Sequence, residues 1–371
     1  MRIEKLRSYN ATRRIFSRGQ VCYAPTVNIN FDQSGVASAC CYNREHILGK
    51  YPENSLTEMW KGESANQLRE FVKEGDLSHG CQMCEKQIDG GNYHGVRARH
   101  FDNYPSRPVN ILKRWIGSSE EPQMPQCLEF ELSNICNLEC TMCNGHFSSL
   151  IRKNRESLPE LENPYDDAFV EQLIPFLPNL QDAKFLGGEP FLVPLYYKIW
   201  DKLAQHNPKV RIHITTNGTV YNNKVKGVLE KLKCGIIISM DSIVKETYEK
   251  IRVNASYERV MDNVQHFREY AKSTGNWFSF AICPMTNNWK EMPDLIRYCN
   301  ANETFVCFNT VYNPEELSLQ SFSSEQLRGV VEYYEEQAFA GYGFLYRQNK
   351  KVFQGLINQL KEWEADNRKL A

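Results

Sequence analysis

The spacing of three cysteines constrains this chain more than any other feature of its sequence. Cys136, Cys140 and Cys143 form a C-x3-C-x2-C triplet in a chain of 371 residues with 13 cysteines. A chance triplet with this spacing is expected with a probability of roughly 0.016. Soft thiolates bind zinc, cuprous copper or iron-sulfur clusters. Three thiolates are one short of the four that fill a cluster, so a cubane bound here would keep one iron open to another ligand.

The composition limits the classes of protein that need to be considered. The chain has 44 Lys plus Arg and 45 Asp plus Glu, a formal charge of -1, which argues against a generally basic nucleic-acid-binding protein. It has no run of about 18 apolar residues, so we expect no membrane span and a cytoplasmic protein. Disulfides are rare in reducing compartments, and the odd number of cysteines therefore predicts metal binding or free thiols.

From residue 126 onward, strand-like runs alternate with helical runs. The six expected strands cover residues 127–133, 183–186, 210–216, 235–240, 277–283 and 305–311. This alternation predicts an α/β fold with a parallel sheet, either open or curled into a partial barrel. Sites in such folds lie at the carboxyl ends of the strands. The cysteine triplet directly follows the first of them.

We predict five regions along the chain. They are a basic N-terminal segment (1–21), a small cysteine-rich domain (22–105), a linker (106–125), the alternating region (126–315) and a C-terminal helical extension (316–371). The cysteine-rich region has little core and clustered thiols, and such modules usually need a metal to fold. A capping box at Ser55 marks one clear helix in it, with apolar residues at helical spacing as far as Phe71. In the extension, residues 324–339 and 347–367 are expected to be helices.

The triplet and its surroundings resemble the radical S-adenosylmethionine (radical SAM) enzymes. In that family the triplet lies after the first strand of a partial (β/α)6 barrel and binds a 4Fe-4S cluster. The resemblance implies that Cys136, Cys140 and Cys143 bind this cluster and that SAM binds its open iron. Met142 stands where the family more often has an aromatic residue, and a thioether can make the same apolar contact. Structural zinc, with His146 completing a Cys3His site, is the alternative.

A second motif follows the second expected strand. Gly187, Gly188, Glu189 and Pro190 are similar to the GGEP motif of the family. The resemblance implies that this backbone and Glu189 receive the methionine amino group of SAM. Glycine allows a close backbone approach, and a carboxylate accepts hydrogen bonds from an ammonium group. Without the resemblance, the same residues would predict only a strand-to-helix turn.

Further matches follow the third and fourth strands. Thr216 and Asn217 begin a segment similar to the TNG segment of the family, which lies near the cofactor. Ser239 and Asp241, with Arg252 downstream, are similar to the serine and distal arginine that hold the methionine carboxylate in the peptide-modifying branch. A guanidinium group suits a carboxylate well. A solvated charge at a helix end is the ordinary alternative for Arg252.

The N-terminal cysteines resemble the opening of the SPASM and twitch modules, which carry auxiliary 4Fe-4S clusters. Cys22, Gly35 and Cys40 have the C-x(9-15)-G-x4-C spacing. In most relatives the module follows the barrel, whereas here it precedes it. The later C-x5-C-x3-C portion is absent, which implies one auxiliary cluster. The implied ligands are Cys22, Cys40, Cys81 and Cys84, with Cys41 as an alternative to Cys40. Structural zinc is again the alternative.

The resemblance implies an enzyme that reductively cleaves SAM to a 5'-deoxyadenosyl radical, which removes hydrogen from a substrate C-H bond. We expect peptide or protein modification, with a sugar or another small metabolite as the alternative substrate and a non-catalytic zinc or iron-sulfur scaffold as the second alternative. Cys283 and Cys307 are candidates for a hydrogen-atom donor, although buried thiols are usually inert. The expected partners are the substrate, an electron donor such as flavodoxin or ferredoxin, and a separate peptide-recognition protein.

Overall fold

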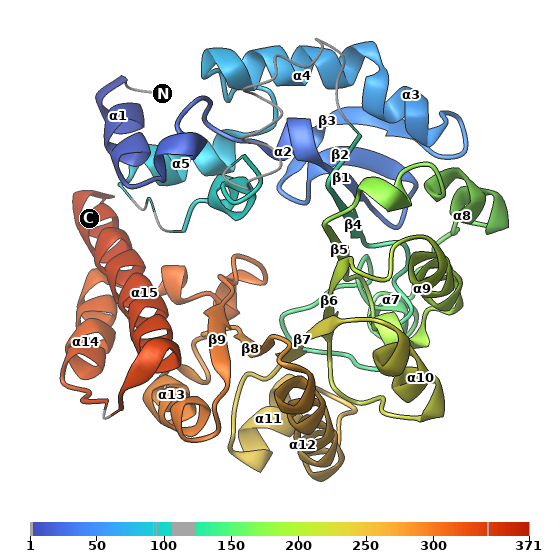
Figure 1. The fold of residues 1–371 in the computed structure, drawn as a ribbon. Coiled ribbons are helices and arrows are strands. Elements are labelled where there is room, and N and C mark those ends of the chain that lie inside the picture. The colour runs from blue at the N-terminus through green and yellow to red at the C-terminus, as the bar shows by residue number, and fades with distance from the viewer. Residues whose placement is uncertain (1–2, 92, 94, 106–123, 340, 371) are drawn as a thin grey trace. The chain divides into compact units, whose positions relative to one another are not determined.

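The computed structural model describes residues 3–91, 93, 95–105, 124–339 and 341–370 (Figure 1). Most of the predicted linker over residues 106–125 therefore lies outside the described residues. The chain divides into two compact units. Unit 1 comprises Met1–Ser133, Leu161–Gly187 and Val193–Ile212, and unit 2 comprises Asn134–Glu160, Gly188–Leu192 and His213–Ala371. The five predicted regions do not coincide with these units, and their bounds stay predictions.

Unit 1 contains a mixed sheet. The strand order is β3 (Asn43–Lys50), β2 (Val36–Cys40), β1 (Asn28–Phe31), β4 (Cys127–Phe130) and β5 (Asp182–Phe185). The pairs β1–β2 and β2–β3 are antiparallel, whereas β1–β4 and β4–β5 are parallel. In this register Asn30 lies opposite Glu129, and Glu129 lies opposite Lys184. The cysteine-rich region thus extends the sheet that begins the alternating region, and the sequence did not predict its three strands.

Helices cover this sheet. They are α1 (Ile3–Ala11), η1 (Ile15–Ser17), α2 (Ala24–Val27), α3 (Leu56–Lys61), α4 (Glu63–Glu74), α5 (Gln82–Asp89), η2 (Arg97–Phe101), α8 (Asp167–Leu173), η3 (Leu177–Asn179) and α9 (Pro194–His206). Figure 1 shows α3 and α4 beside β3, in agreement with their contacts. Phe130 stacks on Phe185 and Phe31, and Phe169 of α8 and Trp200 of α9 pack edge-on against these rings. An aromatic core therefore fixes one face of the sheet.

The predicted helix at Ser55 is confirmed, with one difference. Ser55 and Glu58 form the expected capping box. The helix ends at Gly62, however, and a second helix, α4, begins at Glu63. A Cβ at Gly62 would lie 2.4 Å from the carbonyl oxygen of Glu58. Gly62 has an extended backbone, with φ -68° and ψ 170°, and this residue therefore divides one apolar periodicity between two helices.

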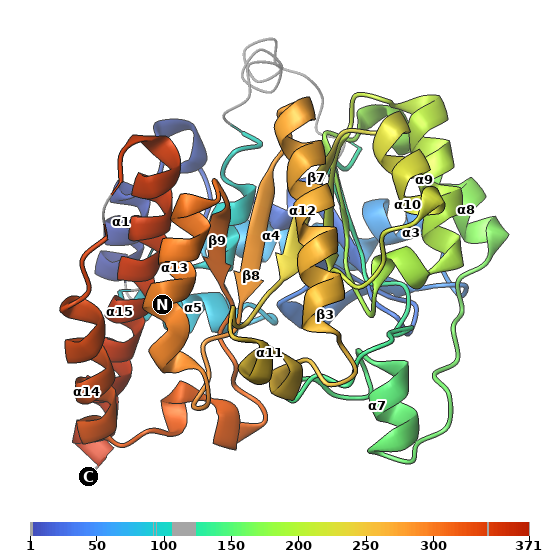
Figure 2. The same ribbon diagram turned by 90° about the horizontal axis from the view of Figure 1, so that it is seen from below.

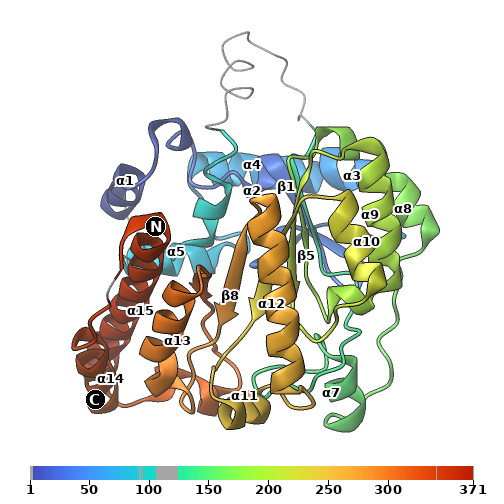
Figure 3. The ribbon, with the colours of Figure 1, turned by 60° about the horizontal axis from the view of Figure 1, so that its bottom comes forward.

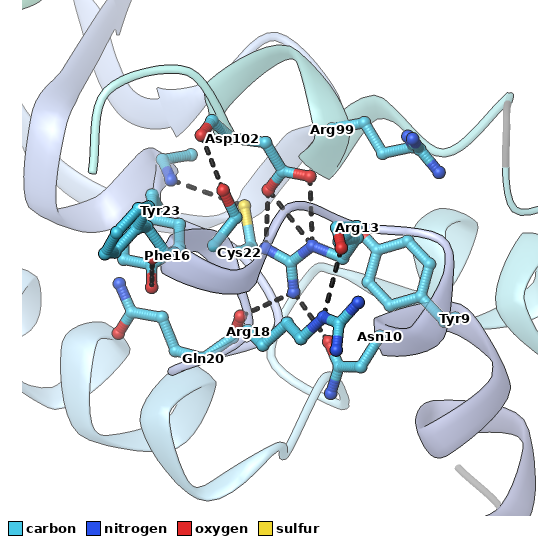
Figure 4. A network of polar contacts seen from close by, with 12 residues as sticks. Tyr9, Asn10, Arg13, Phe16, Arg18, Gln20, Cys22, Tyr23, Arg99 and Asp102 are labelled. Atoms are coloured by element: carbon cyan, nitrogen blue, oxygen red, sulfur yellow. Dashed lines mark hydrogen bonds and ion pairs between the residues drawn. The ribbon is translucent and has the colours of Figure 1, made fainter. Parts of the chain in front are cut away.

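A buried ion pair holds the N-terminal segment within unit 1. The Nε of Arg13 donates to both carboxylate oxygens of Asp102, at 3.1 and 3.0 Å, and its Nη1 donates to Asn10 and to the carbonyl oxygen of Gln20 (Figure 4). Ser17 donates to the carbonyl oxygen of Asp102 at 2.7 Å. The side chain of Arg13 is fully buried. The basic segment therefore contributes a structural cation to unit 1.

Replacing Asp102 with asparagine should destabilise unit 1, because it leaves the buried charge of Arg13 uncompensated. Breaking a buried ion pair in this way costs roughly 3 to 5 kcal/mol of unfolding free energy. Urea denaturation of the full chain would measure the change. The exposed Glu74→Gln variant is the control for the loss of one negative charge. Equal midpoints for the two variants would contradict a stabilising role of the pair.

Unit 2 continues the alternation of strands and helices. Strand β6 (Arg211–Thr216) begins in unit 1 and ends in unit 2. The strands β7 (Cys234–Ser239), β8 (Phe278–Ile282) and β9 (Phe305–Phe308) pair in parallel in that order. The helices of unit 2 are α7 (Ser149–Asn154), η4 (Pro190–Leu192), α10 (Asn223–Lys231), α11 (Lys245–Ile251), α12 (Tyr257–Thr274), η5 (Trp289–Glu291), α13 (Met292–Ala301), η6 (Glu315–Leu317), η7 (Leu319–Ser321), α14 (Ser324–Glu335) and α15 (Gly343–Leu370).

The helices of unit 2 pack against its strands and against one another. Figure 2 shows α12 along β7 and β8, and Figure 3 shows α14 and α15 side by side. All six strands predicted from the sequence are confirmed, as are the two C-terminal helices. The α/β fold is the one typical of the predicted partial barrel. No helix in the described ranges is long and apolar enough to cross a membrane.

Candidate cofactor sites

The cysteine triplet lies in a loop of unit 2 that is fixed by backbone hydrogen bonds. The amide of Thr141 donates to the carbonyl oxygen of Ile251 at 2.9 Å, and the amide of Cys143 donates to that of Cys140 at 3.1 Å. Burial raises the pKa of Cys136 to about 12 and that of Cys143 to about 11. A metal bound to these thiols would favour their thiolate forms.

The two glycines of the GGEP segment adopt backbone conformations that other residues disfavour. Gly187 has φ 77° and Gly188 has φ 50°. A Cβ at Gly188 would lie 2.2 Å from the carbonyl oxygen of Ile135, which immediately precedes Cys136. In unit 1, a Cβ at Gly187 would lie 3.0 Å from Cα of Glu131. Gly188 therefore allows the segment to pack directly against the cysteine loop.

Glu189 joins the GGEP segment to the segment after β6. Its Oε1 accepts from the hydroxyl of Thr216 at 2.8 Å and from the amide of Phe191 at 3.1 Å. Its Oε2 accepts from the amide of Asn217 at 2.7 Å, which leaves one lone pair of Oε2 for a further donor. The side chain is fully buried, and burial raises the pKa of Glu189 to about 7.

Asn217 extends this network to the cysteine loop. Its Nδ2 donates to Oδ1 of Asn137 at 2.9 Å and lies 3.9 Å from Sγ of Cys136. Asn137 in turn donates to the hydroxyl of Thr219 at 2.9 Å. The structure thus brings the predicted residues Glu189, Thr216 and Asn217 to the first cysteine of the triplet. Pro190 begins η4, beside Glu189.

The residues after β7 converge on the second cysteine. Nε of Arg252 donates to Oδ2 of Asp241 at 2.6 Å, and Nη1 lies 3.6 Å from Sγ of Cys140. Oδ1 of Asp241 accepts from the amide of Cys283 at 2.8 Å. Asp241 is fully buried and both of its oxygens are engaged. The hydroxyl of Ser239 and Nη2 of Arg252 have no hydrogen-bond partner among the described residues, so they are available to an anionic ligand.

The two candidate hydrogen-atom donors differ in position. Cys283 interacts electrostatically with Asp241, Arg252 and Cys140, and its burial raises its pKa. It also packs, with Met142, against an apolar cluster that includes Ile251. Cys307, on β9, lies opposite Ala281 of β8 and interacts electrostatically with Cys283, and its Sγ is 3.5 Å from the carbonyl oxygen of Phe280. Cys283 is thus the nearer of the two to the triplet, and the donor role of either stays a prediction.

Four N-terminal cysteines line one cavity in unit 1. Apolar side chains form most of its wall, and its sulfur-bearing residues are Cys22, Cys40, Cys81 and Cys84. Cys41 lies in the turn after β2 and is not among the described residues that line it. Of the two alternatives that the sequence left open, the structure therefore places Cys40 with the other three cysteines.

Neutral N–H donors face the sulfur atoms of this cavity. The amide of Ala24 donates to Sγ of Cys22 at 3.3 Å, and Nδ2 of Asn43 donates to Sγ of Cys81 at 3.3 Å. Burial raises the pKa of Cys81 to about 12 and that of Cys84 to about 11. Such donors stabilise thiolates and the sulfur atoms of a cluster. The residues present fit an iron-sulfur cluster.

Among the described residues, no three His, Cys, Asp or Glu side chains are placed so that they could hold a single metal ion. The family models described below therefore decide between zinc and a cluster at the two sites.

Several residues near the sites were not singled out from the sequence. Asn43 and Arg97 line the cavity of unit 1, and Glu129 binds Arg97 at 2.9 Å and Lys184 at 2.6 Å. Asn137 supports Asn217 in unit 2. One sequence signal could have revealed the ion pair of Glu129 and Lys184. The alternation of apolar and acidic residues in β4 indicates a strand, and pairing with β5 places Glu129 opposite Lys184.

Two family models match the parts of the chain that contain the two groups of cysteines. The model described as the radical SAM superfamily matches residues 130–299. The model described as the SPASM iron-sulfur cluster-binding domain matches residues 22–85. These ranges contain the cysteine triplet and the four cysteines of the cavity. The zinc scaffold alternative has no comparable support.

Individual relatives are similar over parts of their length. The chain is 26% identical over 178 residues to a probable GTP 3',8-cyclase of Methanocaldococcus jannaschii. The matched region covers 46% of this chain and 54% of the cyclase. The chain is also 30% identical over 138 residues to the antilisterial bacteriocin subtilosin biosynthesis protein AlbA of Bacillus subtilis. The matched region covers 37% of this chain and 28% of AlbA. The chain thus spans about half or less of the length of these curated relatives.

A solved structure, native anSMEcpe with bound AdoMet and the Cp18Cys peptide, is similar with a TM-score of 0.42 and 20% identity, over 57% of this chain and 60% of that chain. Together with the family models, the sites define an iron-sulfur enzyme that uses SAM. Residues 130–299 thus belong to the radical SAM superfamily, and the SPASM domain of residues 22–85 precedes them in the chain. Its cofactors are SAM, the radical SAM 4Fe-4S cluster and an auxiliary iron-sulfur cluster.

Proposed function

We propose that this radical SAM enzyme modifies a peptide or protein substrate and that its two sets of cysteines bind two clusters. Cys136, Cys140 and Cys143 bind the SAM-binding 4Fe-4S cluster. The observation that carries the proposal for the second cluster is the cavity that Cys22, Cys40, Cys81 and Cys84 share. When bound, SAM and its cluster supply a 5'-deoxyadenosyl radical that removes hydrogen from a C-H bond.

The residues of unit 2 orient SAM in this proposal. The unused lone pair of Glu189 Oε2 and the backbone of Gly188 accept hydrogen bonds from the methionine ammonium group. The hydroxyl of Ser239 and Nη2 of Arg252 donate to the methionine carboxylate. Asp241 positions Arg252, because its Oδ2 accepts from Nε of Arg252 at 2.6 Å. Ile251, Met285 and Val311 form a buried apolar cluster beside Met142 of the cysteine loop, and these residues would exclude water there.

Replacing Gly188 with alanine should weaken SAM binding, because the new Cβ would clash with Ile135 at 2.2 Å. Displacement of this backbone is expected to raise the Kd of SAM at least roughly tenfold. Anaerobic equilibrium dialysis would measure it. Gly227→Ala in α10 is the control, since a Cβ there meets nothing within 4 Å. Equal affinities in the two variants would contradict the assigned position of this backbone.

The peptide assignment is supported by the presence of a SPASM domain and by the similarity to a bacteriocin biosynthesis protein. The test uses anaerobically reconstituted enzyme with a strong reductant and a peptide carrying deuterium on its side chains. We expect deuterium to appear in 5'-deoxyadenosine. If the enzyme binds iron normally but forms no 5'-deoxyadenosine with any substrate, the proposed chemistry is wrong.

Action on a small metabolite is the second candidate, and the similarity to a GTP cyclase favours it. Transfer of deuterium from a labelled nucleotide or sugar, but not from a labelled peptide, would establish this alternative. The proposed electron donor is a flavodoxin or ferredoxin, which replacement of the chemical reductant would test. A separate peptide-recognition protein belongs only to the peptide version.

A further inference from the structure

The cavity of the four cysteines contains one charged residue. Among the described residues that line it, Arg97 alone carries a formal charge. The guanidinium group interacts electrostatically with Cys40 and Cys41. Its Nη2 donates to Oε1 of Glu129 at 2.9 Å, while its Nε is buried without a hydrogen-bond partner in the described part of the chain. A buried, unpaired N–H on the cation of the cavity wall indicates a missing acceptor.

The charges around Arg97 do not balance. Arg97 and Lys184 both bind the carboxylate of Glu129, which is fully buried. The neighbouring carboxylate, Glu131, is paired with Arg44 at 2.8 Å. Two cations thus share one anion, and the surplus is one positive charge. A buried unpaired charge is costly unless a counter-charge compensates it.

An iron-sulfur cluster bound by four thiolates supplies that counter-charge. Its net charge is negative and becomes more negative by one unit when it accepts an electron. A nearby cation therefore stabilises the reduced state more than the oxidised state, and net charge and hydrogen bonds to sulfur set cluster potentials. The N–H donors to Cys22 and Cys81 described above are neutral, so they stabilise the reduced cluster less than a full positive charge does.

We propose that Arg97 sets the reduction potential of the auxiliary cluster, with its guanidinium charge stabilising the reduced cluster and Nε donating to a cluster or thiolate sulfur. Glu129 holds the guanidinium group in this position and moderates its charge. This inference rests on the proposed binding of the cluster by Cys22, Cys40, Cys81 and Cys84. Arg97 is a positioning residue, because it acts through the cluster.

Arg99 provides a matched control on the same 3-10 helix. Its Nη1 donates to the hydroxyl of Thr12 at 2.8 Å and to the carbonyl oxygen of Tyr93 at 3.3 Å. Figure 4 shows its side chain directed away from Cys22. Arg99 does not line the cavity in the described part of the chain. Removal of its charge should therefore leave the auxiliary cluster unaffected.

The experiment isolates the auxiliary cluster in the full chain. In a background where Cys136, Cys140 and Cys143 are alanine, about four iron atoms per chain should remain. Redox titration followed by electron paramagnetic resonance then gives the potential of this cluster. For Arg97→Gln we expect a more negative potential, with the ratio of reduced to oxidised cluster at a fixed potential lower by roughly tenfold. Glu129→Gln should shift it in the opposite direction, and Arg99→Gln should not shift it.

The outcomes separate this inference from the proposed function. If the background protein binds no iron, or keeps its iron after Cys84→Ala, the assignment of the four cysteines is wrong. If the cluster is present and Arg97→Gln has the same potential as Arg99→Gln, the role of Arg97 is wrong. If Arg97→Gln cannot be loaded with iron, Glu129→Gln decides: a more positive potential supports the inference, and an unchanged one overturns it.

Discussion

Replacing any one of Cys136, Cys140 and Cys143 with alanine is expected to abolish cleavage of SAM. Each thiolate binds a different iron of the proposed cluster, and a cluster that loses one of three protein ligands is no longer held with its open iron toward the cofactor. The iron content should fall from about eight to about four atoms per chain, because the auxiliary cluster stays bound. Formation of 5'-deoxyadenosine and iron content are the two measurements.

The matched control is Cys299→Ala. Cys299 is fully buried on α13 in the same unit, outside the cysteine loop. This variant removes a thiol but should keep all of the iron and most of the activity. A triplet variant that turned over SAM at the wild-type rate would show that the three cysteines do not bind the catalytic cluster.

The sequence predicted what depends on local spacing. The triplet, the GGEP segment and the six strands of the alternating region could be identified because each is defined within a few residues. The strands β1 and β2 escaped prediction because polar residues, namely Asn28, Asn30 and Ser38, lie between their apolar residues and are buried as well. Such residues are depleted in strands, and only the surrounding tertiary structure buries them here.

The sequence could not reveal contacts between residues that are far apart in the chain. The pair of Arg13 and Asp102 joins residues 89 positions apart, and no local pattern links them. The alternatives Cys40 and Cys41 differ by one residue, and only the folded cavity, which Cys40 lines among the described residues and Cys41 does not, separates them. The same holds for Arg97 of η2, which lies 32 positions from its partner Glu129 in the chain.

Replacing Arg252 with glutamine should weaken SAM binding by roughly a hundredfold while leaving the iron content unchanged. Arg252 is held by Asp241 at 2.6 Å and lies 3.6 Å from Sγ of Cys140, so its free Nη2 is fixed beside the proposed cluster. Loss of one partner of a buried, hydrogen-bonded charge pair typically costs 2 to 5 kcal/mol of binding free energy, about 30-fold or more in affinity. Anaerobic equilibrium dialysis with labelled SAM would measure the Kd.

Lys250→Gln is the control for this variant, because Lys250 is an exposed cation of the same helix, α11. Asp241→Asn adds a second test of the geometry. It keeps the guanidinium group but weakens the interaction that orients it, so its Kd should lie between those of the wild type and Arg252→Gln. An Arg252→Gln variant that bound SAM as tightly as Lys250→Gln would place the methionine carboxylate elsewhere. The Asp241–Arg252 pair would then serve only the packing between α11 and the strand end at Ser239.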